Sequence, residues 1–304
     1  MPQPSVLREP NGRTPLGASS IFRLDTESID LPLGFDPECL PSSHNTSSID
    51  VSHRAIFDIQ EKNMTLSNKV ALVSGANRGI GAAIVKELLN AGVAKVYATV
   101  RDPKTLPSFE DLRVVPLQMD ITSDASVNEA AAAVQDLDVL VNNAGTMAFG
   151  NYLGNSWDSF EGDMQTNYLG TLRVLRAFTP QLVARKSGTI ANLCSIVGLS
   201  AVPLITGYSA SKAALHSLTQ SLRGALEKDN VTVVGIYPGP IDTVLARDLP
   251  YPDKATPESA AVHIVEGIAA GRAYIFPDPL AQQVEHLWAT DNRKLEYMSL
   301  HLGA

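Results

Sequence analysis

The stretch Ser74-Gly75-Ala76-Asn77-Arg78-Gly79-Ile80-Gly81 decides the fold of this chain. An apolar run from Lys69 to Val73 precedes it, and apolar residues at helical spacing follow it up to Leu89. This order predicts a buried strand, a glycine turn and a helix. We expect Gly75 to turn the chain, Gly79 to let backbone approach a phosphate, and Gly81 to let the helix pack closely. The helix N-terminus would then face an anion.

Composition limits the class of protein to which the chain belongs. Its 304 residues are 44% hydrophobic and 18% charged, which is enough for a sizeable core. A formal net charge of -8, without a run of Lys or Arg, argues against nucleic acid as a partner. Cys39 and Cys194 lack metal-ligand spacing, so we expect no metal and a reducing, cytoplasmic compartment. No apolar stretch reaches the roughly 18 residues that span a bilayer, so no membrane is expected.

Residues 1–63 differ in composition from the rest of the chain. They hold seven of the 19 prolines and clustered serines, without a sustained apolar period. This composition predicts a disordered or loosely docked N-terminal extension. Residues 64–304 contain no linker and no repeat, and are predicted to form one domain. Met64 is then a candidate natural start. N-terminal sequencing of the native protein tests this, because a start near Met1 would contradict it.

Beyond the glycine loop, strand patterns alternate with helical patterns. Predicted strands cover 69–73, 94–100, 113–117, 137–141, 188–194, 231–237 and 273–276. Predicted helices cover 123–134, with Ser123 as N-cap, 158–178, ended by Pro180, 208–227 and 257–269. This alternation predicts an α/β fold: one doubly wound, Rossmann-type parallel sheet with helices on both faces.

Further short motifs follow the glycine loop in order. They are Asp120-Ile121, Asn142-Asn143-Ala144-Gly145, Asn167, Ser195, Tyr208-x-x-x-Lys212 and Pro238-Gly239-x-x-x-Thr243. Each is weak alone, but in this order and spacing, over about 65 to 280, the chain resembles the short-chain dehydrogenases/reductases. Ser74 stands where the family usually has threonine, and it keeps the hydroxyl. The resemblance implies that 64–304 is a dinucleotide-binding catalytic domain.

The pair Tyr208 and Lys212 suits acid–base chemistry. Four residues apart on a predicted helix, they lie on one face, one turn apart. A free phenol has a pKa of about 10. A neighbouring ammonium is expected to lower the pKa of Tyr208, which makes the pair a tunable acid and base. The alternative is a surface tyrosine beside a solvated lysine. Small residues around Tyr208, such as Gly207, favour the accessible arrangement.

The family resemblance implies a role for each of four residues. Tyr208 would exchange a proton with the carbonyl oxygen, and Ser195 would hydrogen-bond that oxygen. Lys212 would also hold the nicotinamide ribose, while Asn167 would hold a water that links Lys212 to solvent. Asparagine is a poor residue for a helix interior, and a plain polar helix face is the alternative reading. Cys194 is expected to be a buried small group and no nucleophile.

The remaining motif residues are expected to bind a dinucleotide. By resemblance, Asp120 would bind the adenine amino group, and Ala144 and Gly145 would leave room beside the adenosine ribose. An ordinary turn is the alternative reading of Asn-Asn-Ala-Gly. The expected cofactor-binding residues are Gly75, Asn77, Arg78, Gly79, Ile80, Gly81, Arg101, Asp120, Ile121, Asn143, Ala144, Gly145, Tyr208, Lys212, Pro238, Gly239, Ile241 and Thr243.

The end of the second strand predicts which nicotinamide cofactor binds. An acidic residue there would bind a ribose 2′-OH and repel a 2′-phosphate. By alignment with the family, Val100 occupies that position, Arg101 follows it and Arg78 lies in the glycine loop. Two guanidinium groups suit a phosphate, so NADP(H) is predicted rather than NAD(H). The alternatives are that Arg101 pairs with Asp102 or Glu87, or that Asp102 reaches the ribose.

The residues expected at the substrate are mostly apolar. They are Met147, Phe149, Leu199, Val202, Leu204, Val244, Leu245, Ala246, Leu249, Pro250 and Tyr251. No cation stands among them to bind a carboxylate or phosphate. The sequence therefore favours a small hydrophobic ketone, aldehyde or secondary alcohol, although loop residues constrain the substrate little.

Assembly and two other functions remain open from the sequence. Apolar residues on more than one stripe of helices 158–178 and 208–227, together with the resemblance, predict a homodimer or homotetramer. Burial of both faces within a monomer is the alternative. The chain is predicted to be an oxidoreductase because Asn167, Ser195, Tyr208 and Lys212 are all present. The alternatives are a non-catalytic dinucleotide-binding sensor or scaffold, and an epimerase or dehydratase of the same fold.

Overall fold

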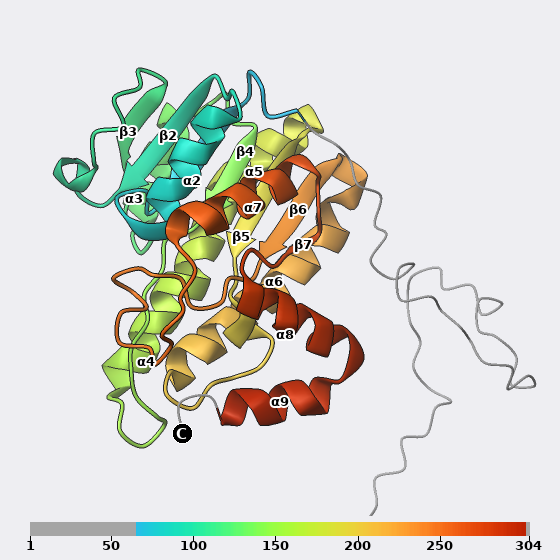
Figure 1. Ribbon diagram of the computed structural model, residues 1–304. Helices are drawn as coiled ribbons and strands as arrows, with labels where there is room; N and C mark the ends of the chain where they lie inside the picture. The colour runs from blue at the N-terminus through green and yellow to red at the C-terminus, as the bar shows by residue number, and fades with distance from the viewer. Residues whose placement is uncertain (1–64, 302–304) are drawn as a thin grey trace, which may run out of the picture. The chain divides into compact units, whose positions relative to one another are not determined.

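The computed structural model describes residues 65–301, and its centre is a parallel sheet (Figure 1). In the described part the sheet has seven strands in the order β3-β2-β1-β4-β5-β6-β7, each parallel to its neighbours. This order confirms the predicted doubly wound α/β fold. The predicted extension 1–63 and the candidate start Met64 lie outside the described residues.

The elements match the predicted ones closely from residue 69 to residue 276. The strands are β1 (Val70–Ser74), β2 (Lys95–Val100), β3 (Val114–Gln118), β4 (Val139–Asn142), β5 (Gly188–Leu193), β6 (Val231–Ile236) and β7 (Tyr274–Ile275). The α-helices are α2 (Gly79–Asn90), α3 (Asp124–Ala133), α4 (Trp157–Asp163), α5 (Thr171–Arg185), α6 (Thr206–Leu226), α7 (Pro257–Ala269), α8 (Pro279–Thr290) and α9 (Asn292–Leu300). Shorter helical pieces are η2 (Pro103–Thr105), the π-helical η3 (Met164–Gly170), η4 (Ile196–Gly198) and η5 (Glu227–Asp229).

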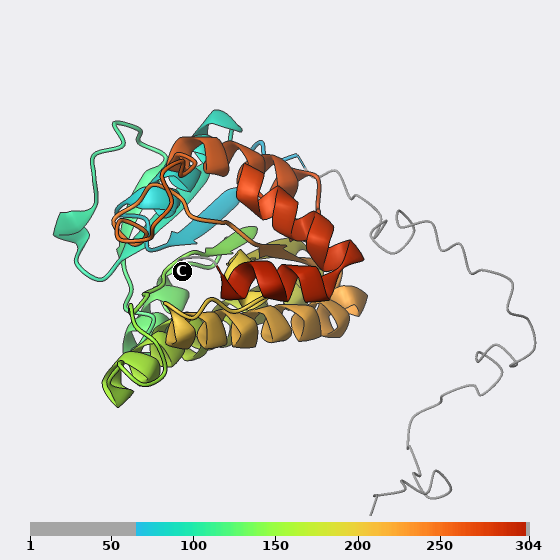
Figure 2. The same ribbon diagram turned by 60° about the horizontal axis from the view of Figure 1, so that its bottom comes forward.

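Alternation along the strands divides the core between the two faces of the sheet. In β1, Ala71 and Val73 belong to one core and Leu72 to the other, because successive side chains of a strand point to opposite faces. Helices α2 and α7 cover the first core, and α3 and α5 cover the second together with the end of α6. In Figure 2 the sheet lies between the orange helix α7 and the gold helix α6.

A third apolar cluster fixes the two C-terminal helices, which the sequence reading did not predict. Leu215 of α6 and Tyr237, just after β6, pack with Val284 of α8 and Leu295 of α9. Helix α8 begins at Pro279, and the Asp278 side chain caps it by accepting from Ala281 N at 3.0 Å. The cluster therefore holds α8 and α9 beside the carboxyl end of the sheet.

One predicted helix boundary is wrong. Pro180 does not end its helix, because α5 continues to Arg185. Proline removes the hydrogen bond to the carbonyl of Arg176, four residues earlier. Both residues are exposed, so water can satisfy that carbonyl. The predicted N-cap of α3 is confirmed, since Ser123 Oγ accepts from Ser126 N at 3.3 Å.

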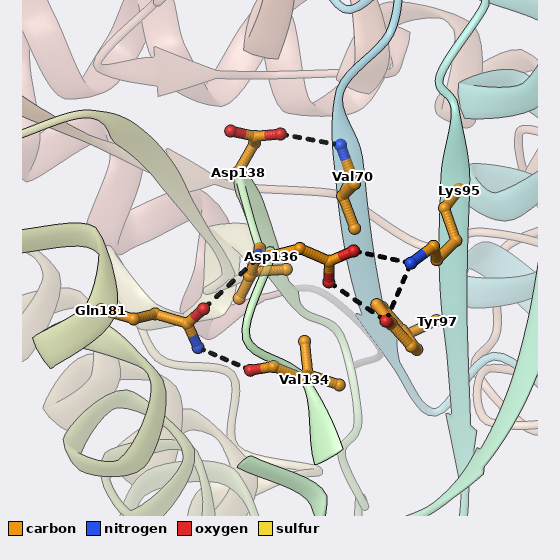
Figure 3. A network of polar contacts seen from close by, with 8 residues as sticks. Val70, Lys95, Tyr97, Val134, Asp136, Asp138 and Gln181 are labelled. Atoms are coloured by element: carbon orange, nitrogen blue, oxygen red, sulfur yellow. Dashed lines mark hydrogen bonds and ion pairs between the residues drawn. The ribbon is translucent and has the colours of Figure 1, made fainter. Parts of the chain in front are cut away.

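A polar network joins the strands at their amino ends, opposite the carboxyl edge of the sheet (Figure 3). Asp136 accepts from Lys95 Nζ at 2.6 Å and from the Tyr97 hydroxyl at 3.1 Å. Asp138 accepts from Val70 N at 2.9 Å. Gln181 of α5 accepts a hydrogen bond from Leu137 N at 3.3 Å and donates one to Val134 O at 3.1 Å, both in the segment before β4. These contacts fix the register of β1, β2 and β4 and leave the carboxyl edge free for ligands.

Candidate active site

Two connected cavities lie at the carboxyl edge of the sheet. Strand order reverses between β1 and β4, and open α/β sheets bind ligands at this kind of switch point. The larger cavity has a volume of about 410 Å³ and the smaller about 90 Å³. Both are lined by Ile80, Ser195, Tyr208, Pro238, Thr243 and Leu245.

The glycine loop turns from β1 into α2 at one end of the larger cavity. Gly75 and Gly79 have φ angles of +66° and +54°, which side chains other than glycine rarely adopt. A Cβ at Gly81 would collide with the carbonyl oxygen of Gly75 and the amide of Asn143. A Cβ at Gly79 would come within 3.0 Å of the Thr243 methyl group. The loop is therefore compact, and the N-terminus of α2 opens onto the cavity.

Ser74 and Asn143 join the ends of β1 and β4. Ser74 Oγ accepts from the backbone N–H groups of Asn143 and Ala144, both at 3.0 Å. Asn143 Nδ2 donates to the carbonyls of Ser74 at 2.8 Å and Gly75 at 3.1 Å. These bonds need a hydroxyl at position 74, which explains why serine works there as well as threonine. They hold the two loops that flank the switch point.

Tyr208 and Ser195 meet where the two cavities join. Burial raises the pKa of the Tyr208 phenol, a hydrogen bond with Ser195 opposes that rise, and the charge of Asp163 adds to it. Ser195 has a φ of +94°, a strained value for a residue with a side chain. Its hydroxyl is oriented by the Pro238 carbonyl, to which it donates at 3.3 Å. The strained turn and this hydrogen bond thus fix the Ser195 hydroxyl beside the phenol.

The expected lowering of the Tyr208 pKa by Lys212 is wrong in this structure. Lys212 Nζ lies 5.5 Å from the Tyr208 ring centroid and donates to the Leu193 carbonyl at 2.7 Å. Lys212 is itself buried, and burial lowers its pKa to about 8. Loss of hydration therefore dominates both side chains. It disfavours the phenolate of Tyr208 and the ammonium of Lys212.

Asn167 and Asp163 lie one turn apart and hold the segment after β4. Asn167 Oδ1 accepts from Thr146 N, and its Nδ2 donates to Thr146 O and to Ser211 Oγ, all at 2.9 Å. Asp163 accepts from the Thr146 hydroxyl at 3.1 Å and from Ala148 N at 3.3 Å. Burial raises the pKa of Asp163, which the sequence reading did not single out. Asn167 lies in the π-helical turn η3, where its side chain bonds the backbone of Thr146. These bonds explain why an asparagine is tolerated inside this helix.

Basic groups also line the larger cavity, one of them within the glycine loop itself. Arg78 and Arg101 both face it, and within residues 65–301 neither forms an ion pair with a carboxylate. Asp102 instead caps η2 by accepting from Lys104 N at 3.0 Å. Burial would raise the pKa of Asp120, but hydrogen bonds from Thr122 and the charge of Arg101 lower it. Two guanidinium groups are therefore left for an anion.

The structure brings most of the predicted cofactor residues to the larger cavity. Those that line it are Gly75, Asn77, Arg78, Gly79, Ile80, Arg101, Asp120, Ile121, Asn143, Ala144, Gly145, Tyr208, Lys212, Pro238 and Thr243. Gly81 does not line it, and Gly239 and Ile241 line the smaller cavity. Asn167 lines neither cavity. Lining residues that the sequence did not suggest are Met119, Thr122, Thr146, Thr166, Leu193 and Thr105, whereas Val100 and Asp102 had been considered at the ribose and Val244 and Leu245 at the substrate.

The smaller cavity is apolar and borders Tyr208 on the side of α9. Eight of the predicted substrate residues line it, namely Met147, Val202, Leu204, Leu245, Ala246, Leu249, Pro250 and Tyr251. Three predictions are wrong: Val244 lines the larger cavity, Phe149 is exposed and Leu199 packs against the third apolar cluster. Val284 and Ser299 of the unpredicted helices α8 and α9 complete the wall. The sequence prediction did not include these two residues because it did not recognise helices α8 and α9.

Cys194 is fully buried beside this site. Its thiol contacts Thr219 Oγ1 at 3.6 Å, and burial raises the pKa of the thiol. The prediction that Cys194 is buried is confirmed. Among residues 65–301, no group of three His, Cys, Asp or Glu side chains is placed to hold a metal ion. None of the helices in this part of the chain is long and apolar enough to cross a bilayer.

Comparison with known proteins identifies relatives of both the sequence and the fold. The family model described as short chain dehydrogenase matches residues 69–253. An uncharacterized oxidoreductase of Staphylococcus saprophyticus is 37% identical over 194 residues, which are 60% of this chain and 82% of that protein. A short chain dehydrogenase from Burkholderia cenocepacia, solved in complex with NADP, is 35% identical with a TM-score of 0.74. The match covers 78% of this chain and 99% of that one.

A second solved structure shares the fold at lower identity. It is a short chain dehydrogenase/reductase from Burkholderia phymatum in complex with NAD, 23% identical with a TM-score of 0.67. That match covers 74% of this chain and 94% of that one. Both solved relatives therefore have the same arrangement of sheet and helices.

Proposed function

Because this chain belongs to the short-chain dehydrogenase family of oxidoreductases, we propose that it transfers a hydride between NADP(H) and a small hydrophobic ketone, aldehyde or secondary alcohol. One observation carries the proposal: the Tyr208 and Ser195 hydroxyls meet at the junction of a large polar cavity and a small apolar one. A cofactor in the first and a carbonyl compound in the second would approach each other at these hydroxyls.

The larger cavity fits a dinucleotide on this chain's own geometry. Gly75 and Gly79 adopt positive φ angles, and the N-terminus of α2 opens onto the cavity, as a pyrophosphate requires. Lys212, Tyr208 and Pro238 also line this cavity, and by family resemblance Lys212 would hold the nicotinamide ribose. When bound, the nicotinamide supplies or accepts the hydride. Asp120 would bind the adenine, and Arg78 and Arg101 the adenosine ribose side.

Tyr208 is the proton donor and acceptor in this proposal. Its raised pKa keeps the phenol protonated at neutral pH, ready to donate to a carbonyl oxygen during reduction. Ser195 hydrogen-bonds the same oxygen and stabilises the charge that develops on it. Lys212 accepts or returns a proton readily because burial brings its pKa to about 8. Asn167 holds the wall of the site and, by family resemblance, a water that links Lys212 to solvent.

The choice of NADP(H) rests on this chain's residues, because the solved relatives include one NADP complex and one NAD complex. Val100, at the position of the acidic residue in NAD-binding relatives, has no charge. Asp102 is held in the cap of η2, which opposes its use as a ribose ligand. Arg78 and Arg101, without carboxylate partners in the described part of the chain, suit a 2′-phosphate.

A panel of carbonyl compounds and alcohols, assayed with both cofactors, tests the proposal. We expect consumption of NADPH with hydrophobic ketones or aldehydes, and a kcat/KM for NADPH well above that for NADH. A bound but unconsumed cofactor would instead favour a sensor or scaffold. Conversion of a sugar or hydroxy compound without net NADPH consumption would favour an epimerase or dehydratase.

Assembly and location complete the proposal. We propose a homodimer or homotetramer that forms through α4, α5 and α6, and a cytoplasmic location in keeping with the cysteine content. The exposed Trp157 at the start of α4 supports an apolar contact there. Sedimentation of the full chain measures the assembly, and a monomer would contradict it.

A further inference from the structure

The smaller cavity carries more hydroxyl groups than the proposed chemistry uses. No charged residue lines it. Ser195 and Tyr208 belong to the catalytic pair, and Thr243 Oγ1 is satisfied by Ile241 O at 3.3 Å. Ser200, Tyr251 and Ser299 remain. Their hydroxyls form no hydrogen bond with any group in residues 65–301.

Ser299 is the most informative of these three. It lies one turn after Leu295 on the inward face of α9, and the two residues are 4% and 1% exposed. An apolar side chain would suit this position, yet the residue is a serine that faces the cavity. Some buried side-chain atoms of the described residues lack a hydrogen-bond partner, but Ser299 Oγ is not one of them. Its hydroxyl is therefore open to the cavity, where a polar group of a bound molecule can form a hydrogen bond with it.

Ser299 and Tyr251 stand on walls distinct from the one that carries the catalytic pair. Tyr208 comes from the start of α6 and Ser195 from the turn after β5. Tyr251 belongs to the loop before α7, and Ser299 to α9. Burial raises the pKa of Tyr251, so its hydroxyl stays neutral and able to donate. A molecule whose carbonyl touches Tyr208 would thus meet further hydroxyls with another part of its framework.

We propose that Ser299, assisted by Tyr251, forms a subsite for a second, neutral oxygen of the substrate. The substrate class is then an apolar ketone or alcohol that carries a hydroxyl or carbonyl group away from the reacting carbon. This inference rests on the proposed function and narrows it. Anionic substrates are excluded because the cavity offers no cation to a carboxylate or phosphate.

The test uses the full chain and three cyclohexanones that carry an ethyl, a hydroxymethyl or a carboxylate group opposite the ketone. Ethyl and hydroxymethyl have nearly the same size, so they differ only in the hydroxyl. Calorimetry in the presence of NADP⁺ measures binding without turnover, and assays with NADPH measure kcat/KM. We expect the hydroxymethyl ketone to be the best of the three in both measurements and the carboxylate the worst.

Variants of Ser299 assign the effect to this hydroxyl. Ser299→Ala should lower affinity and kcat/KM for the hydroxymethyl ketone by about tenfold, the effect of one hydrogen bond, and leave the ethyl ketone within about twofold. Ser299→Thr keeps the hydroxyl and should restore most of the preference. Ser221→Ala, at an exposed position of α6, is the matched control and should change neither ketone.

The outcomes separate this inference from the proposed function. Hydroxyl-dependent binding without any NADPH consumption would leave the subsite standing and overturn the oxidoreductase proposal for these ketones. Turnover with equal losses for both neutral ketones in Ser299→Ala, or with none, would overturn the subsite. Failure of the hydroxymethyl ketone to bind would also overturn it.

Discussion

The backbone N–H of Gly239 donates a hydrogen bond of 2.7 Å to Oδ2 of Asp278. The same carboxylate caps α8 through Ala281 N, and it is only 3% exposed. A Cβ at Gly239 would come within 2.7 Å of Asp278 Oδ1. The glycine of the Pro-Gly motif is thus required by a carboxylate 39 residues away, which ties the loop over both cavities to the C-terminal helices.

These two hydrogen bonds make Asp278 a stabilising and positioning residue. Asp278→Ala removes the cap and leaves the half-buried Gly239 N–H without its partner, so we expect the free energy of unfolding to fall by about 2–4 kcal/mol. Asp278→Asn keeps one acceptor oxygen and should cost about half as much. Urea denaturation measures both. Asp291→Ala, a cap at the exposed start of α9, is the control, and an equal loss there would argue against a special role for Asp278.

Tyr208→Phe tests the proton donor. Removal of the hydroxyl leaves the ring and the packing of α6, so we expect the fold and NADPH binding to persist while kcat falls by about 10²–10⁴-fold. Steady-state kinetics and cofactor fluorescence titration measure the two effects. Tyr152→Phe changes an exposed tyrosine and should leave kcat unchanged. Substantial activity in Tyr208→Phe would remove the phenol from the proposed chemistry.

Arg78 and Arg101 are expected to set the cofactor preference. Each guanidinium should contribute a charge-assisted hydrogen bond to the 2′-phosphate, so either change to Ala should raise KM for NADPH by about 10-fold or more. KM for NADH should change little, because NADH lacks that phosphate. Arg293→Ala, at an exposed arginine of α9, serves as the control. Equal effects on both cofactors would place these arginines elsewhere on the dinucleotide.

Asp163 gives the site a pH dependence whose sign follows from its charge. Ionised Asp163 raises the pKa of Tyr208 and favours the ammonium of Lys212. Alcohol oxidation needs Tyr208 to accept a proton, so its rate rises with pH as the phenol ionises. Asp163→Asn removes the charge and lowers the pKa of Tyr208. The rise in kcat/KM for oxidation should therefore move to lower pH, by about one unit.

A control on the same helix distinguishes this electrostatic effect from a structural one. Glu161→Gln changes an exposed glutamate of α4 and should leave the profile in place. A general loss of activity in Asp163→Asn without a shifted profile would mean that Asp163 only holds residues 146–148.

The sequence predicted the parts of this fold that have a local signal. The β1–α2 turn was predictable because Gly75 and Gly79 are needed for backbone conformations that the sequence displays directly. Helix α8 also had a signal, Asp278-Pro279 as cap and first residue, and the reading overlooked it. Asp163 could not be found in this way, because a carboxylate on a helix normally indicates a solvated face.

The direction of the Tyr208 pKa was equally beyond the sequence. Spacing places Lys212 one turn from Tyr208, but it does not reveal that Nζ is turned to the Leu193 carbonyl. Nor does spacing show how completely each group is buried. Long-range relations of this kind, including Gly239 with Asp278, depend on tertiary packing rather than on local pattern.

The π-helical turn η3 fixes the rotation of α5 relative to α4, which together with η3 form one continuous helix. On its amino-terminal side Asp163 is directed at the loop after β4, and on its carboxyl-terminal side Leu175 and Phe178 are directed into the core. A π-helical turn holds more residues than an α-helical turn. If the same seven residues formed a regular α-helix instead, one half would rotate against the other by about 100°. Either the carboxylate or the apolar stripe would then point the wrong way, so the width of this turn is as constrained as its chemistry.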